Sequence, residues 1–166
     1  PLALLFLAQM ATTIPASLYM QRVGRRLGFM TSSVFGMAGA AIATVGVLKS
    51  EFNLFCFGTI LIGVFNGFGQ YYRFAAAESA SEQYRSRAIS YVLAGGLIAA
   101  FAGPNLAKWS RHVLPEEFAG SYAILTGIYL LALGIAFFLC LPEPGAATRT
   151  AGGRPLGEIA RQPAYF

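Results

Sequence analysis

Long apolar runs with almost no charged residues, separated by short charged stretches, constrain this chain more than any other feature. The backbone inside lipid must satisfy its own hydrogen bonds, and membrane-spanning strands would alternate polar and apolar residues, which these runs do not do. A helix needs about 20 residues to cross the hydrocarbon core of a bilayer. The sequence therefore predicts an all-α, polytopic transmembrane helical bundle. The five expected spans lie near residues 1–19, 28–48, 53–77, 88–107 and 119–141.

Composition excludes a water-soluble domain. Of the 166 residues, 56% are hydrophobic and only 11% are charged, whereas soluble domains carry about 25% charged residues. The formal net charge of +5 is explained by membrane topology and gives no reason to expect a nucleic-acid partner. The expected surroundings are a lipid bilayer, with the chain as a multi-pass protein of a cell membrane of the bacterial inner-membrane type.

Three arginines stand between the first two runs, in the stretch "RVGRR". Each arginine costs roughly 2.5–3.5 kcal/mol at the centre of a membrane helix on insertion scales. We therefore expect residues 20–27 to form a tight loop outside the hydrocarbon core, with Gly24 allowing the reversal. The arginines either anchor the topology alone or also bind helix ends, acidic side chains or lipid headgroups.

The side of the membrane follows from the distribution of basic residues. Five spans place residues 20–27, 78–87 and 142–166 on one face, which receives nine arginines if Arg73 at its edge is counted, against three basic residues on the other face. Basic residues concentrate in cytoplasmic loops, so this face is predicted to be cytoplasmic. The nine are Arg22, Arg25, Arg26, Arg73, Arg85, Arg87, Arg149, Arg154 and Arg161.

The stretch "SLYMQRVGRRLGF" resembles the signature loop between the second and third helices of the major facilitator superfamily. That pattern is Gly, three residues, Asp, Arg or Lys, any residue, Gly, Arg, and Arg or Lys. Ser17 and Gln21 stand where the pattern has Gly and Asp, so Gln21 brings a hydrogen-bonding group without a charge. The resemblance implies a cytoplasmic gate that locks the outward-facing state. Its residues here are Gln21, Arg22, Gly24, Arg25 and Arg26.

Two further stretches are similar to the same family. "AESASEQYRSRAIS" looks like its second cytoplasmic loop, with Glu78, Arg85 and Arg87 at the charged positions. "GGLIAAFAGPNLA" is similar to the motif on the fifth helix of the family's antiporters, with Gly103 and Pro104 at its centre. The alternative for this last pair is structural, because proline kinks a helix and glycine lets a neighbour approach. The resemblance implies helices two to six, partnered by a first helix and a carboxy-terminal half of the same chain.

Polar side chains inside the spans indicate where a solute passes. Asn66, Gln70 and Arg73 are spaced i, i+4 and i+7, which places them on one face of a helix, and such a stripe faces the bundle interior or a water-filled path. Alternatively, Arg73 reaches the inner surface and the two amides bond to neighbouring helices. Gln9 and Thr13 form a shorter polar face near the start of the chain, which serves either the same path or helix packing.

Small residues recur at intervals that let membrane helices approach closely. The steps are Gly36–Gly39–Ala43, Gly63–Gly67 and Gly95–Ala99–Gly103. The expected spans contain no Asp or Glu, no histidine pair with metal-ligand spacing, no nucleophile elbow and no phosphate-binding loop. We therefore expect neither an enzyme nor a bound metal or cofactor.

These observations predict one membrane domain, residues 1–141, followed by the start of a cytoplasmic interdomain linker, residues 142–166. Because the chain begins at Pro1 within an apolar run and stops within the linker, we expect a piece of a longer permease. The predicted function is secondary active transport of a small solute by alternating access, with the Gly–Pro motif favouring proton-coupled efflux. The alternatives are uptake of an anionic metabolite and a non-transporting membrane scaffold or assembly subunit.

Overall fold

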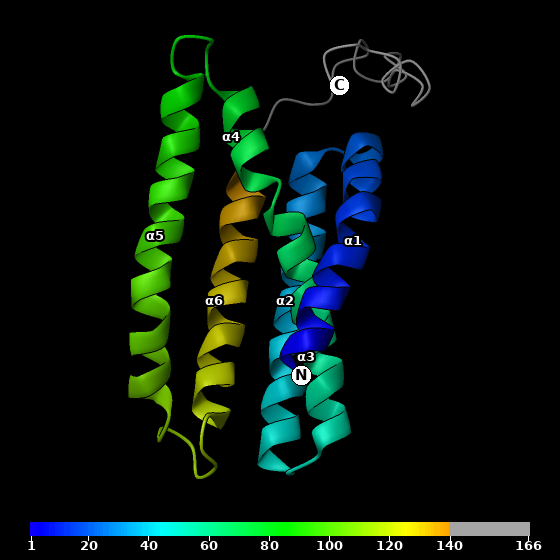
Figure 1. Cartoon of the computed structure of the whole chain (residues 1–166), viewed down its shortest axis with the longest axis vertical. Coiled ribbons are helices and arrows are strands. Elements are labelled where there is room, and N and C mark those ends of the chain that lie inside the picture. The colour runs from blue at the N-terminus through cyan, green and yellow to red at the C-terminus, as the bar shows by residue number, and fades with distance from the viewer. Residues whose placement is uncertain (140–166) are drawn as a thin grey trace, which may run out of the picture.

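The computed structural model describes residues 1–139, and this part of the chain is helical without strands. Five segments, with α3 and α4 counted as one, are long and apolar enough to cross a membrane, which confirms the predicted all-α class. Figure 1 shows the long helices side by side, with α6 between α5 and the α2–α3 pair. The end of the fifth predicted span, residues 140–141, and the predicted linker, residues 142–166, lie outside the described residues. The helices are α1 (Leu2–Val23), α2 (Arg25–Leu48), α3 (Phe52–Gly69), α4 (Tyr72–Ser79), α5 (Arg85–Ser110) and α6 (Ala119–Phe138).

The connection between α1 and α2 is a single residue, so the predicted loop over 20–27 is wrong in extent. Arg22 lies in the last turn of α1, and Arg25 and Arg26 open the first turn of α2. Gly24 alone is non-helical, with φ 93° and ψ 158°, a region essentially restricted to glycine. The helices can continue this far because arginine side chains are long enough to carry their charge beyond the helix end.

Replacing Gly24 with alanine is expected to destabilise the protein. The added Cβ strains the backbone at this φ by about 1–3 kcal/mol, so the Gly24→Ala variant should melt at a lower temperature in detergent. A suitable control is Gly127→Ala on α6, where an added Cβ meets nothing within 4 Å and helix propensity favours alanine. Equal melting temperatures for the two variants would show that Gly24 is not required for the reversal.

The third span is broken, which corrects the expectation of one helix over 53–77. α3 ends at Gly69 and α4 begins at Tyr72, with Gln70 and Tyr71 in a turn. Glycines at the end of α3 weaken helix propagation, and the Tyr71 hydroxyl donates a hydrogen bond to the Thr13 carbonyl oxygen of α1 at 2.7 Å. As a result, Asn66 and Arg73 belong to different helices and do not share one straight face.

Glycines bring the backbones of α2 and α3 into direct contact. A Cβ added at Gly39 would lie 2.7 Å from the Gly58 carbonyl oxygen, and one added at Gly58 would lie 2.6 Å from the Gly39 oxygen. On the other side of α3, Gly63 and Gly67 pack equally closely on α1. The predicted small-residue steps on α2 and α3 are therefore packing surfaces. A bilayer offers no hydrophobic drive between helices, so close packing supplies much of the association.

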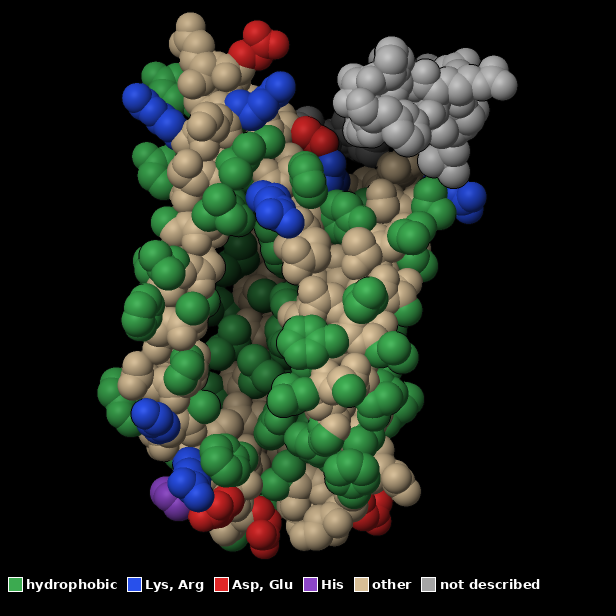
Figure 2. Space-filling model, in the orientation of Figure 1, with side chains coloured by type: hydrophobic (Ala, Val, Ile, Leu, Met, Phe, Trp, Pro, Cys, Tyr) green, Lys and Arg blue, Asp and Glu red, His purple; other side chains and the backbone are tan. Residues whose placement is uncertain are grey.

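α5 is held mainly at its ends. Near its carboxy-terminal end, the Ser110 and Ser121 hydroxyls lie 2.8 Å apart, and Ser121 donates to the Ala107 carbonyl oxygen at 3.1 Å. In the connecting loop, Arg111 bonds Glu117 at 2.8 Å, and this hydrogen bond, followed by the charge of Arg111, lowers the pKa of Glu117. Between its ends α5 stands apart, and Figure 2 shows a hollow between it and the rest of the bundle.

Candidate cytoplasmic gate and pathway residues

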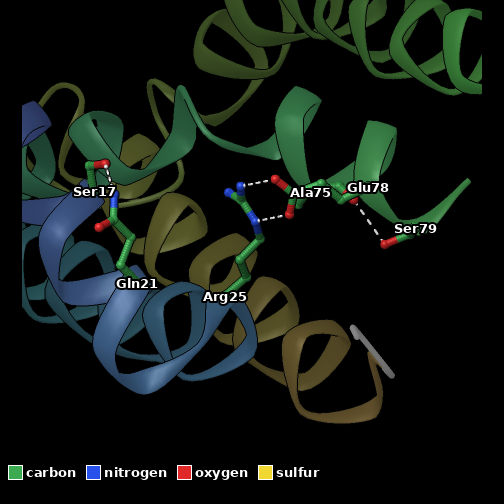
Figure 3. Close-up of polar contacts among 6 residues, drawn as sticks. All are labelled: Ser17, Gln21, Arg25, Ala75, Glu78 and Ser79. Atoms are coloured by element: carbon green, nitrogen blue, oxygen red, sulfur yellow. Dashed lines mark hydrogen bonds and ion pairs between the residues drawn. The ribbon is translucent and has the colours of Figure 1, made fainter. Parts of the chain in front are cut away.

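An ion pair joins the two loops that the sequence singled out separately. Arg25, the first residue of α2, donates through Nε to Glu78 Oε2 at 2.5 Å, and its Nη2 donates to Glu78 Oε1. Figure 3 shows the guanidinium facing the carboxylate near the end of α4. Two parallel charge-assisted bonds of this kind fix geometry as well as distance. This ion pair between residues 53 positions apart in sequence thus joins the first turn of α2 to the end of α4.

Local structure on both sides positions this pair. The break at Gly24 places Arg25 at the very start of α2. After the turn that ends α3, the chain enters α4, and the ring of Tyr72 stacks on Phe29 of α2 with centroids 4.3 Å apart. Ala75, one turn before Glu78, is buried. Packing of α4 therefore decides where the Glu78 carboxylate lies.

The strength of the pair suits a reversible contact. The side chains of Arg25 and Glu78 are 22% and 55% exposed, so solvent screens much of their attraction. Pairs of this exposure contribute about 0–1 kcal/mol. A contribution of about 1 kcal/mol shifts a two-state equilibrium by about fivefold. The pair can bias one conformation without making it permanent.

Arg26 makes a second contact at this end of the bundle, with the last turn of α6. Its guanidinium donates to the Phe137 carbonyl oxygen and lies 5.4 Å from the centroid of the Phe137 ring. Phe137 is in the last turn of α6, where the unpaired carbonyls and the helix dipole favour a cation. The sequence singled out Arg26 but not this partner, which lies 111 residues away.

The remaining motif residues make local contacts. Gln21 Nε2 donates to the Ser17 hydroxyl at 3.4 Å, one turn earlier on α1, so the two departures from the family pattern face each other. Arg22 forms no hydrogen bond or ion pair within the described part of the chain. The guanidinium of Arg87 lies 5.6 Å from the centroid of the Tyr84 ring, and Arg85 is exposed at the start of α5.

The predicted pathway residues are only partly brought together. Arg73 donates to the Gln70 side-chain oxygen at 3.4 Å, and both residues are exposed. Asn66 is half-buried one turn earlier, on α3. Thr13 lies at the contact of α1 with α3, where its hydroxyl bonds the Gln9 carbonyl oxygen at 2.8 Å. Within residues 1–139, no hydrogen bond links the pair on α1 to Asn66.

The fifth-helix motif lies within α5, which continues from Arg85 to Ser110 through Pro104. A Cβ added at Gly95 or Gly103 would meet nothing within 4 Å. The two glycines of the small-residue step predicted on this helix therefore pack against no described neighbour. Among residues 1–139, no group of three or more His, Cys, Asp or Glu side chains is placed to hold a metal ion.

Known proteins resemble this chain along its whole length. The sequence profile of the Major Facilitator Superfamily matches residues 1–166. The chain is 40% identical over 171 residues to the riboflavin transporter RfnT of Brucella anthropi, an alignment that covers 100% of this chain and 42% of that protein. It is 25% identical to YdeG of Bacillus subtilis strain 168, an uncharacterized MFS-type transporter, over 90% of this chain and 36% of that protein.

A second Bacillus subtilis protein, the uncharacterized MFS-type transporter YddS, is 26% identical over 75% of this chain and 29% of its own length. The chain thus spans less than half the length of these three relatives. No solved structure matches. The profile match over the whole chain and the identity to a named transporter place it in a family of transporters rather than of enzymes. The chain belongs to the major facilitator superfamily.

Proposed function

We propose that the complete protein is a secondary transporter that carries riboflavin or a closely related flavin by alternating access. The observation that carries this proposal is the 40% identity to a riboflavin transporter along the full length of this chain. In this proposal the chain supplies most of one half of a two-part bundle. Transporters of this kind hold the solute near the bilayer midplane and rock their halves about it.

In this proposal, the contacts of Arg25 with Glu78 and of Arg26 with the end of α6 act as a cytoplasmic gate. Figure 1 shows the α1–α2 and α4–α5 connections at the same end of the bundle. The ion pair of Arg25 with Glu78 and the contact of Arg26 with the end of α6 tie three helices together at this end. We propose that these contacts form when the cytoplasmic side is closed and separate when it opens.

The transport proposal is tested in a bacterium that cannot make riboflavin and has no importer of its own. If the complete protein is an importer, its expression should allow growth on low external riboflavin and accumulation of radiolabelled riboflavin, whereas an exporter should support neither. The same measurement in everted vesicles determines direction, since an exporter fills everted vesicles and an importer fills right-side-out ones. A protein that reaches the membrane but moves riboflavin in neither preparation contradicts the proposal and leaves a scaffold role.

Proton-coupled efflux is the form of transport favoured by Gly103 and Pro104, through their resemblance to the antiporter motif. In the described spans, Glu78 is the single acidic residue. The coupling acid would therefore be Glu78 or a residue outside the described part. An antiporter should lose its flux when a protonophore removes the pH gradient, and flux that persists would argue against proton coupling.

We propose that the solute passes along Asn66, Gln70 and Arg73, with Gln9 and Thr13 at the edge of its path. The test is Arg73→Lys in the complete protein. Lysine keeps the charge but loses the planar fork that bonds Gln70 and would hold an anionic group. Transport should fall several-fold at an unchanged amount of protein. Unchanged transport would show that Arg73 only reaches for the inner surface, which would also remove the basis for uptake of an anionic metabolite.

A further inference from the structure

The direction of α4 decides whether Glu78 reaches Arg25, and this direction is set at the start of the helix. The Ala75 amide donates to the Tyr71 carbonyl oxygen at 2.9 Å, so helical geometry begins at Tyr71, directly after the break that ends α3. Tyr71, Ala75 and Glu78 are spaced i, i+4 and i+7, which places them on one face of α4. Because Glu78 lies about 10 Å along the helix from Tyr71, a tilt of α4 at its start displaces the Glu78 carboxylate.

Close packing of α3 on α1 stops just before this break. A Cβ added at Gly67 would lie 2.9 Å from Thr12 Cβ of α1, whereas one added at Gly69 would meet only the Tyr72 ring, at 3.9 Å. Glycine without close neighbours leaves the backbone free to change direction. Beyond the break, buried Ala75 packs in an apolar cluster that α4 shares with α1 and α2, but apolar burial is non-directional.

The Tyr71 hydroxyl supplies a directional contact at this point. It donates to the Thr13 carbonyl oxygen of α1 at 2.7 Å, and hydrogen bonds depend on angle as well as on distance. In the described part of the chain, hydrogen bonds from two residues join α4 to α1 and α2, from Tyr71 at its start and Glu78 near its end. The Tyr71 bond therefore fixes the end of α4 about which the helix would otherwise tilt.

The acceptor of this bond lies beside a weak point of α1. Pro15 is inside α1 and has no N–H, so the Ala11 carbonyl loses its helical partner. The Thr13 hydroxyl bonds the Gln9 carbonyl oxygen at 2.8 Å, and back-bonding of this kind bends helices. Tyr71 thus joins the break between α3 and α4 to the turn of α1 that proline weakens.

We propose that Tyr71 is a positioning residue of the gate, whose hydrogen bond to α1 holds α4 in the direction that brings Glu78 to Arg25. This inference rests on the proposed gate. Tyr71 acts through Glu78 and has no contact with the solute in this role. Loss of its hydroxyl leaves α4 free to tilt at the break, and the Arg25–Glu78 pair separates.

The first test measures the placement of α4 without the ion pair and without transport. Arg25→Cys and Glu78→Cys are introduced into the complete protein after its own cysteines have been replaced. The rate at which a short bifunctional thiol reagent joins the two cysteines is then followed in membranes. Adding Tyr71→Phe keeps the ring and removes the hydroxyl, so the rate should fall by about two- to tenfold, the range for one lost hydrogen bond.

The control for this test is Tyr19→Phe, which removes a hydroxyl contact between α1 and α2, with Thr31 at 3.2 Å, and should leave the cross-linking rate unchanged. An unchanged rate with Tyr71→Phe overturns the inference. A Tyr71→Phe protein that no longer reaches the membrane also overturns it, because the hydroxyl would then act in folding rather than in the gate.

The second test determines whether Tyr71 acts through Glu78, by a double-mutant cycle on the flux of radiolabelled riboflavin. Tyr71→Phe should lower the initial rate by about two- to tenfold in the wild type and have no further effect in a Glu78→Gln protein. Tyr19→Phe should change the rate by the same factor in both backgrounds. An equal factor for Tyr71→Phe in both backgrounds overturns the inference while the gate stands. A Glu78→Gln protein that transports at the wild-type rate overturns the gate, and this role of Tyr71 with it.

Discussion

Reversing the charge of Arg25 is expected to reduce transport by about tenfold or more, and exchanging the charges of the pair should restore much of it. Arg25→Glu replaces an attraction of about 1 kcal/mol with a repulsion of similar size across the bidentate contact with Glu78. If the pair is the proposed gate, the closed state then loses population. The Arg25→Glu, Glu78→Arg double variant recovers the opposite charges, and initial rates of solute flux measure both effects.

Glu82 provides the matched control for this experiment. It is exposed and lies four positions after Glu78, and Arg25 makes its ion pair with Glu78 instead. Arg25→Glu combined with Glu82→Arg restores the same net charge, so it should not rescue transport. Equal rescue by both double variants would mean that Arg25 acts through the overall charge at this end of the bundle.

Placing valine at Gly58 is expected to prevent the α2–α3 pair from packing. The new side chain would meet the Gly39 oxygen at 2.6 Å and the Ala43 backbone nitrogen at 2.7 Å, and backbone atoms cannot move aside as flexible side chains can. Overpacking of this kind destabilises a protein by about 1–3 kcal/mol or more. The yield of monodisperse protein after detergent extraction should fall sharply for Gly58→Val.

Gly127→Val on α6 is the control, since an added Cβ there meets nothing within 4 Å. Both variants carry the same residue change in the middle of a membrane helix, so differences in insertion and helix propensity largely cancel. If Gly58→Val extracts and elutes as well as Gly127→Val, the close approach of α2 and α3 is not what holds this part of the bundle together.

The helical class and the five spans were predictable because hydropathy acts over about 20 residues at a time. Breaks within and between the helices were harder to predict from the sequence, because they depend on single residues. The turn at Gln70 and Tyr71 follows glycines that hydropathy treats as ordinary span residues, and it is fixed by the Tyr71 contact with distant Thr13. The Gly24 reversal was located correctly but made too long, since arginines can leave the hydrocarbon core without leaving a helix.

The residues of the Arg25–Glu78 ion pair could be picked out from the sequence, but their pairing could not. The resemblance singled out Arg25 and Glu78, yet their contact depends on the direction of α4 after the break, which no local pattern encodes. The end of α6 gave no signal as a partner for Arg26, because the acceptor is a backbone oxygen.

The most direct test of the account is to tether the gate. Cysteines are introduced as Arg25→Cys and Glu78→Cys in a complete protein whose own cysteines have been replaced, and a short, cleavable bifunctional thiol reagent joins them. The account predicts that the tethered protein stops transporting and that cleavage of the tether restores the original rate. Transport at the untethered rate by fully cross-linked protein would contradict a gate between α2 and α4.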